Sequence, residues 1–185
     1  MVPGPMADPA GLAARIDRLE SVGQIRQLAW RYSATLDSRD MDGLMALYDE
    51  DVELSGGRRG RDALRRGMEP ALQRVRITIL HVGNHVIDFV DDDHATGVVY
   101  CHADVQTDPD TWTTQAIHYG DRYVRRDGRW YFAAARRHEL FYGTEHGQSP
   151  VGLPPADWPT HDTGTGTLPY RWDSWQRFWA EQPLA

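Results

Sequence analysis

A phenol, two carboxylates and an imidazole stand at positions from which they could do chemistry together. Tyr32 and Asp37 lie five residues apart in a segment with helical periodicity, whereas His81 and Asp104 fall in two successive segments of alternating apolar residues. A carboxylate near an imidazole fixes its tautomer and raises its proton affinity, and a phenol donates a hydrogen bond to an oxygen that gains charge. This set suits abstraction of a proton next to a carbonyl or from a ring carbon.

This hypothesis depends mainly on His81. If no bulge interrupts its strand, it shares one largely apolar face with Ile77, Ile79, Gly83, His85, Ile87 and Phe89. A histidine on such a face needs a hydrogen-bond partner, because an unpaired buried polar group costs about 1–3 kcal/mol. It is therefore either a general base or a core histidine with a structural partner.

Further side chains could line the same space as substrate-binding residues: Tyr48, His85, His102, His118, Arg136 and Arg137. The two arginines point to opposite faces of a regular strand, and the alternation with Trp130 and Phe132 favours Arg136 as the inward one. His81 and His85 would lie about 13 Å apart along a strand, too far to hold one metal ion. No metal is expected, and no glycine-rich fingerprint indicates a nucleotide cofactor.

The elements that must position these residues follow from periodicity. One or two helices are expected over residues 12–37, then a helix over 42–48, a strand over 52–54, a loop over 55–60 and a helix over 61–73. Four strands come next, over 76–90, 94–106, 112–125 and 130–141, with turn residues at 91–93, 108–110 and 127–128. Helices followed by an antiparallel meander of hairpin-connected strands predict an α+β domain whose curled antiparallel sheet encloses a pocket.

The two ends of the chain differ from this domain. Residues 1–11 contain three prolines and are expected to be a disordered leader, and the domain is expected over 12–142. Residues 143–185 form a tail rich in proline and glycine that ends in an aromatic stripe of Trp172, Trp175, Phe178 and Trp179. Because such a stripe is costly to expose, it should dock on the domain, on a second subunit or over the pocket mouth.

Composition excludes several classes of function. The 185 residues carry 20 Lys and Arg against 27 Asp and Glu, and the net charge of −7 disfavours binding to nucleic acid or to anionic membranes. No apolar run approaches the about 20 residues of a membrane span, and no signal peptide is evident. One cysteine, Cys101, fits a reducing compartment, so a cytoplasmic location is expected.

Three runs of sequence resemble a known family. RYSATLDSRDMDGLMALYDEDVEL, ILHVGNHVIDF and RRDGRWYFAAARRHELFYG together resemble the SnoaL-like members of the nuclear transport factor 2 (NTF2) superfamily, over residues 12–142. Within that family the chain resembles bile acid 7α-dehydratase and scytalone dehydratase, and more loosely the lindane dehydrochlorinase. The resemblance implies an NTF2-like (cystatin-like) cone, a hydrophobic small-molecule substrate, no cofactor, and a homodimer or homotrimer.

The resemblance also implies roles for residues. Tyr32, Asp37, His81 and Asp104 match the tyrosine, aspartate, histidine and second aspartate of the bile acid enzyme. The dehydrochlorinase uses an arginine in one of its last strands. The residue spacing in the family slightly favours Arg137 over Arg136 as the counterpart of that arginine.

Three functions remain open. The first is a lyase of the dehydratase type or an isomerase, acting on a hydrophobic, ring-bearing steroid, polyketide or aromatic metabolite through a His–Asp general base. The second is a polyketide cyclase, which differs only in the step after the carbanion has formed. The third is a small-ligand-binding or assembly module without catalysis, although several ionisable groups in an apolar pocket are costly to keep as mere scaffold.

Overall fold

The computed structural model describes residues 8–108, 111–146 and 172–181. Its first element, α1 (Pro9–Ser38), is one continuous helix rather than two. The Asp8 side chain caps it by accepting a hydrogen bond from the Ala10 N–H, and Pro9 occupies the first turn, where its missing N–H costs nothing. The expected disordered leader is therefore too long, because residues 9–11 are helical; residues 1–7 lie outside the described residues.

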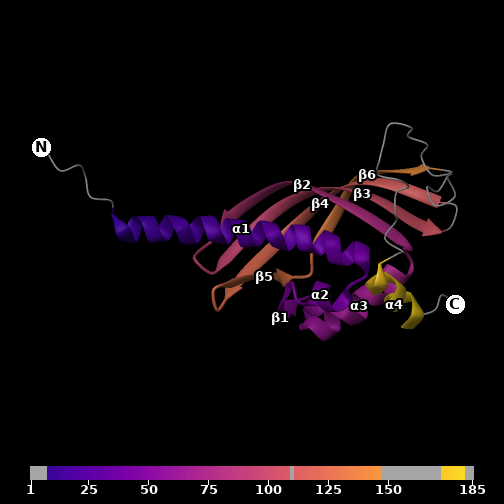
Figure 1. Ribbon diagram of the computed structural model, residues 1–185, viewed down its shortest axis with the longest axis horizontal. Coiled ribbons are helices and arrows are strands. Elements are labelled where there is room, and N and C mark those ends of the chain that lie inside the picture. Colours follow the sequence, from indigo (N-terminus) through magenta and orange to yellow (C-terminus); the bar gives the residue numbers. More distant parts are fainter. Residues whose placement is uncertain (1–7, 109–110, 147–171, 182–185) are drawn as a thin grey trace, which may run out of the picture.

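The second half of α1 packs its apolar side chains into the core, whereas the first half contacts the sheet mainly through Asp17 and Arg18. Leu12, Ile16 and Leu19 are about half exposed or more, whereas Ile25, Leu28 and later residues at helical spacing are buried. In Figure 1 the first part of the helix extends past the sheet, and the second part crosses it. The C-terminal half is thus the part that positions functional side chains.

Short elements follow the end of α1. Arg39 ends the helix in the left-handed conformation (φ 57°), and its buried guanidinium bonds the Leu36 carbonyl and the Thr78 hydroxyl. The side chain of Asp40 caps α2 (Met41–Met45), which is followed by β1 (Tyr48–Glu53), the single 3-10 turn η1 (Ser55–Gly57) and α3 (Arg61–Gln73). Strand β1 begins at Tyr48, whereas the sequence predicted this residue at the end of a helix.

A six-stranded sheet forms the body of the domain. Its strands are β1, β2 (Ile77–Phe89), β3 (His94–Asp108), β4 (Thr111–Arg126), β5 (Arg129–Ala134) and β6 (Arg137–His146), in the order β1-β5-β4-β3-β2, with β6 also pairing with β4. The single strand expected over 130–141 is wrong, because the chain leaves β5 after Ala134 and resumes pairing at Arg137 along the other half of β4. β1 is parallel to β5, so the sheet is mixed rather than an antiparallel meander.

The sheet curves around α1, with α2 and α3 at one end (Figure 1). Buried apolar side chains from α1, α2, β1 and the concave face of the sheet form one core. The predicted α+β, NTF2-like architecture is confirmed by this arrangement and by the structural relatives described below.

The aromatic C-terminal segment docks on the domain itself. It forms α4 (Asp173–Glu181), whose Phe178 is buried in the core and whose Trp175 Nε1 donates to the Arg76 carbonyl at 3.1 Å. Ser174 Oγ donates to the Ser38 carbonyl at the end of α1, at 2.7 Å. Of the three docking sites that the sequence allowed, the described residues use the domain; the proline- and glycine-rich residues 147–171 lie outside the described part. No helix of the described chain is long and apolar enough to cross a membrane.

Candidate active site

A cavity of about 410 Å³ lies between the helices and the concave face of the sheet. This volume falls within the range of small-molecule sites. Most of its lining is apolar: Leu36, Leu64, Met68, Ala71, Leu72, Val75, Leu80, Ala103, Val105, Ile117 and Ala135. The polar lining consists of Tyr32, Tyr48, Thr78, Thr107, Gln115, Tyr119, Arg136 and His138. An apolar pocket with a few polar groups is typical of a site for a hydrophobic small molecule.

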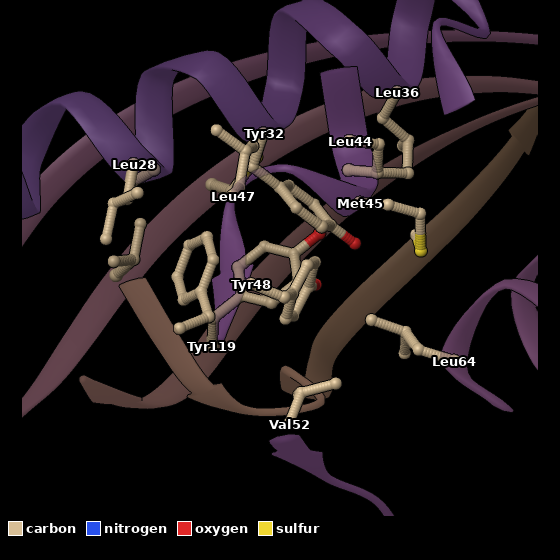
Figure 2. Packing of buried hydrophobic residues seen from close by; sticks show 14 of the residues in the cluster. Leu28, Tyr32, Leu36, Leu44, Met45, Leu47, Tyr48, Val52, Leu64 and Tyr119 are labelled. Carbon is tan, nitrogen blue, oxygen red and sulfur yellow. The ribbon is translucent and has the colours of Figure 1, made fainter. Parts of the chain in front are cut away.

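Three phenols face this cavity. Tyr32 comes from α1, Tyr48 from the start of β1 and Tyr119 from β4, and among the described residues none of their hydroxyls makes a hydrogen bond. Figure 2 shows the hydroxyls of Tyr32 and Tyr48 directed into the same space. Burial raises the pKa of all three phenols, so they stay protonated and can donate to a ligand.

Arg136 completes this group of donors. Its guanidinium lies over the rings of Tyr32 and Tyr119, with the central carbon 4.4 and 3.9 Å from their centroids. Nε and Nη2 donate to the two carboxylate oxygens of Asp121 at 2.8 and 2.7 Å, whereas Nη1 has no partner among the described residues. Burial alone would lower the pKa of Arg136, but the charge and hydrogen bonds of Asp121 outweigh it and raise the pKa.

The structure decides between the two arginines. The side chain of Arg136 is 2% exposed and faces the cavity, whereas that of Arg137 is 81% exposed and pairs with Glu139. Alternation along the strand therefore selected the inward residue correctly.

Asp37 lies beside the cavity, in the last turn of α1. Its Oδ2 accepts the backbone N–H of Leu80 at 3.0 Å, and Oδ1 is buried without a partner among the described residues. Desolvation raises the pKa of Asp37 from 3.8 to about 6, against the lowering effect of the Leu80 N–H and the Thr78 hydroxyl. Asp37 is not itself a lining residue, but its neighbours Leu36, Thr78 and Leu80 are, so this carboxylate lies directly behind the wall of the pocket, with one oxygen that has no partner among the described residues.

His81 and Asp104 do not join Tyr32 and Asp37. His81 is exposed and lies directly across from His102 on the convex face, because its neighbours Leu80 and Val82 take the concave face. Asp104 is on the same convex face and accepts a hydrogen bond from Thr114 at 2.8 Å. Among the described residues no hydrogen bond or ion pair joins His81 to either aspartate.

A bulge explains the error. The pairing of β2 with β3 shifts between Val82 and His85, so Gly83 and Asn84 together oppose a single residue, Tyr100. The residues from Ile77 to Phe89 therefore do not keep one face. His85, which the sequence placed beside His81, points to the concave side, where its Nε2 lies 3.0 Å from the Tyr123 hydroxyl.

Of the other residues that the sequence predicted to bind the ligand, some line the cavity and others lie outside it. Tyr48 lines the cavity, but His85 lies apart from its lining. His102 is exposed on the convex face, and His118 lies there against the rings of Tyr100 and Phe141. The expectation that these three histidines line the cavity is wrong, because sheet alternation and the bulge direct them elsewhere.

Tyr119 and Asp121 were not predicted from the sequence, whereas His138, which follows the two arginines and from its sequence position could join the pocket, does line the cavity. A signal for the first two was present in β4, where Ile117, Tyr119, Asp121 and Tyr123 alternate with residues of the other face. A carboxylate within an apolar run of this kind indicates a buried polar partner. Within the described ranges, no group of three or more His, Cys, Asp or Glu side chains is arranged to hold a metal ion.

Comparison with known families identifies this architecture. A family model for the SnoaL-like domain matches residues 17–136, which include most of α1 and the strands β1 to β5. The chain belongs to the SnoaL-like family. A comparison with curated proteins gave no match.

Solved structures of SnoaL-like relatives share the fold. A protein assigned as a scytalone dehydratase, from Novosphingobium aromaticivorans, is 27% identical with a TM-score of 0.63, over 76% of this chain and 99% of that one. A hexachlorocyclohexane dehydrochlorinase, LinA type 2, is 23% identical with a TM-score of 0.65, over 78% and 99% of the two chains. LinA type 3 from Novosphingobium barchaimii is 24% identical with a TM-score of 0.65, over 76% and 99%.

Proposed function

We propose that this SnoaL-like protein is a cofactor-independent lyase or isomerase that removes a proton from a hydrophobic, ring-bearing small molecule. The observation that carries the proposal is the pairing of a carboxylate of raised pKa, Asp37, with a cavity wall of four hydrogen-bond donors. A dehydratase and a dehydrochlorinase among the structural relatives support the same class of reaction.

Asp37 is the proposed base. Its free Oδ1 takes a proton from a carbon next to a carbonyl, and the electron pair of that C–H bond moves to the carbonyl oxygen. A carboxylate with a pKa of about 6 is a better base than an ordinary aspartate and is still ionised at neutral pH. This assignment replaces the His81–Asp104 base, because those residues occupy the other face of the sheet.

The donors serve the oxygen that becomes negative. Tyr32, Tyr48, Tyr119 and Nη1 of Arg136 are free to donate, and no acceptor competes for them among the described residues. Donors placed before the reaction stabilise developing charge strongly in a cavity with little water. In a dehydration the enolate expels the β-hydroxyl, which leaves as water with the proton that Asp37 took up. In an isomerisation Asp37 returns that proton to another carbon.

Proton abstraction can be tested without the natural substrate. The probe is 2-tetralone, a bicyclic ketone, and the measurement is deuterium uptake at its α-carbons in D₂O by NMR. We expect the protein to accelerate exchange over buffer, and Asp37→Asn to reduce that acceleration about 100-fold or more, the usual range for loss of a general base. His81→Ala is the matched control and should stay within about three-fold of the wild type, because His81 lies outside the cavity.

The same assay separates the alternatives. Exchange that is lost in His81→Ala and retained in Asp37→Asn would refute the assignment of the base. No acceleration by the wild type would favour a binding module without catalysis. With cyclic β-hydroxy ketones and polyketide-like chains as substrates, product mass distinguishes dehydration, which loses water, from isomerisation or cyclisation, which retain the mass.

A further inference from the structure

Behind the cavity, Arg136 is the first member of a chain of buried polar groups. Asp121, whose side chain has no exposed surface, accepts both hydrogen bonds from Arg136 and a third from the Tyr123 hydroxyl at 2.9 Å. The Tyr123 oxygen in turn lies 3.0 Å from Nε2 of His85. These groups connect the wall of the cavity to the opposite half of the cone.

The direction of each hydrogen bond follows from the count of protons. The single hydroxyl proton of Tyr123 goes to Asp121, so His85 must donate its Nε2–H to the Tyr123 oxygen. Burial lowers the pKa of His85 to about 4, which keeps the imidazole neutral, and its Nδ1 is buried without a partner among the described residues. The chain of groups therefore contains one cation, Arg136, and one anion, Asp121.

This balance limits what the cavity can bind. The ion pair has no net charge, although Nη1 of Arg136 still presents its N–H groups to the cavity. Because Asp121 already balances the charge of Arg136, a carboxylate brought into this apolar space would be an anion without a cation to compensate it, and an uncompensated buried charge is costly. A neutral carbonyl costs little to bury when it accepts hydrogen bonds, and it gains stabilisation as negative charge develops on its oxygen.

We infer that Asp121 is a positioning residue that neutralises and orients Arg136, so that the cavity accepts an uncharged carbonyl compound in preference to a carboxylate or another preformed anion. This inference rests on the proposed function, since it concerns the substrate of the same site. It specifies that the substrate is uncharged. It also attributes the preference for neutral over anionic ligands to Asp121, which does not line the cavity.

The experiment measures the charge preference of the pocket with 4-nitrophenol, whose phenolate absorbs visible light and whose phenol does not. Titrating the bound probe with pH gives the ratio of its affinities as phenolate and as phenol. In Asp121→Asn the charge of Arg136 is no longer neutralised, and we expect the preference for phenolate to rise about ten-fold or more. In Arg136→Gln it should fall by a similar factor. Asp49→Asn, which changes a buried carboxylate bonded to Arg126 outside the cavity, should leave the ratio unchanged.

A double variant protects the test against misfolding of either single variant. Arg136→Gln with Asp121→Asn removes both charges, and the phenolate preference should differ from the wild type by no more than about three-fold. The inference is overturned if Asp121→Asn leaves or lowers the preference, if the double variant loses as much as Arg136→Gln alone, or if the wild type binds no probe. Because no turnover is measured, a failure here leaves the deuterium-exchange result and the assignment of Asp37 untouched.

Discussion

The raised pKa of Asp37 makes a quantitative prediction about stability. Its pKa lies at about 6 in the folded protein against an ordinary value of 3.8, so the native state holds a proton that the unfolded chain has lost between these two values. At about 1.4 kcal/mol per pKa unit, this difference corresponds to about 3 kcal/mol. Asp37 therefore costs stability above about pH 6 and costs none below about pH 4.

The measurement is the free energy of unfolding of the wild type minus that of Asp37→Asn, from urea titrations at several pH values between 4 and 8. Subtraction removes the contribution of other titrating groups to first order. We expect this difference to fall by about 2 kcal/mol from pH 4 to pH 6 and to level off above about pH 7, because the buried carboxylate loses its proton over that interval.

Asp17 supplies a control of opposite sign. A hydrogen bond from Arg125 lowers the pKa of Asp17, so the same subtraction for Asp17→Asn should rise with pH below about pH 4 and stay nearly flat between pH 4 and pH 8. If the Asp37 difference is flat between pH 4 and pH 7, or rises, the carboxylate is not held in a desolvated site. Asp37 would then have no raised pKa to support its role as the base.

Three further predictions concern other parts of the molecule. Arg136→Gln leaves Asp121 buried without its cation and should lower the free energy of unfolding by about 3–5 kcal/mol. The double variant with Asp121→Asn should recover most of this free energy. If urea titrations show that Arg136→Gln lowers the free energy of unfolding by less than about 1 kcal/mol, that result contradicts a buried ion pair. Phe178→Ala should cost about 3–5 kcal/mol, because α4 buries this ring in the core, and an unchanged melting temperature would show that α4 does not dock there. We propose that copies of the chain associate through the convex face into a homodimer or homotrimer. On this face the rings of Tyr100 and Phe141 stack with their centroids 5.6 Å apart and remain about half exposed. Phe141→Glu should then yield monomers by light scattering, and an unchanged molecular mass would argue against this contact.

Residues whose role depends on helical period were predictable from the chain alone. The spacing of Tyr32 and Asp37 placed both at the inner end of α1, where the structure has them buried. Local alternation beside Trp130 and Phe132 likewise identified Arg136 as the inward arginine. The prediction for Tyr32 and Asp37 succeeded because it depends on neighbouring residues within one regular helix, whereas Arg136 follows the end of β5 and still keeps the inward side.

Residues that depend on pairing between strands could not be placed in this way. Alternation carries no information across a bulge, so the step at Gly83 and Asn84 put His81 and His85 on opposite faces, and Asp104 went to the convex face with His81. The contact of Asp121 with Arg136 spans 15 residues and two strands.

The sequence by itself therefore determined the fold class, the family features, and the two α1 side chains that flank the pocket. Only the tertiary structure decided which ionisable groups share that pocket, because the register between β2 and β3 and the burial of Asp121 come from packing of distant segments. The same packing raises the pKa of Asp37, since desolvation is a property of the assembled core and not of any local stretch of chain.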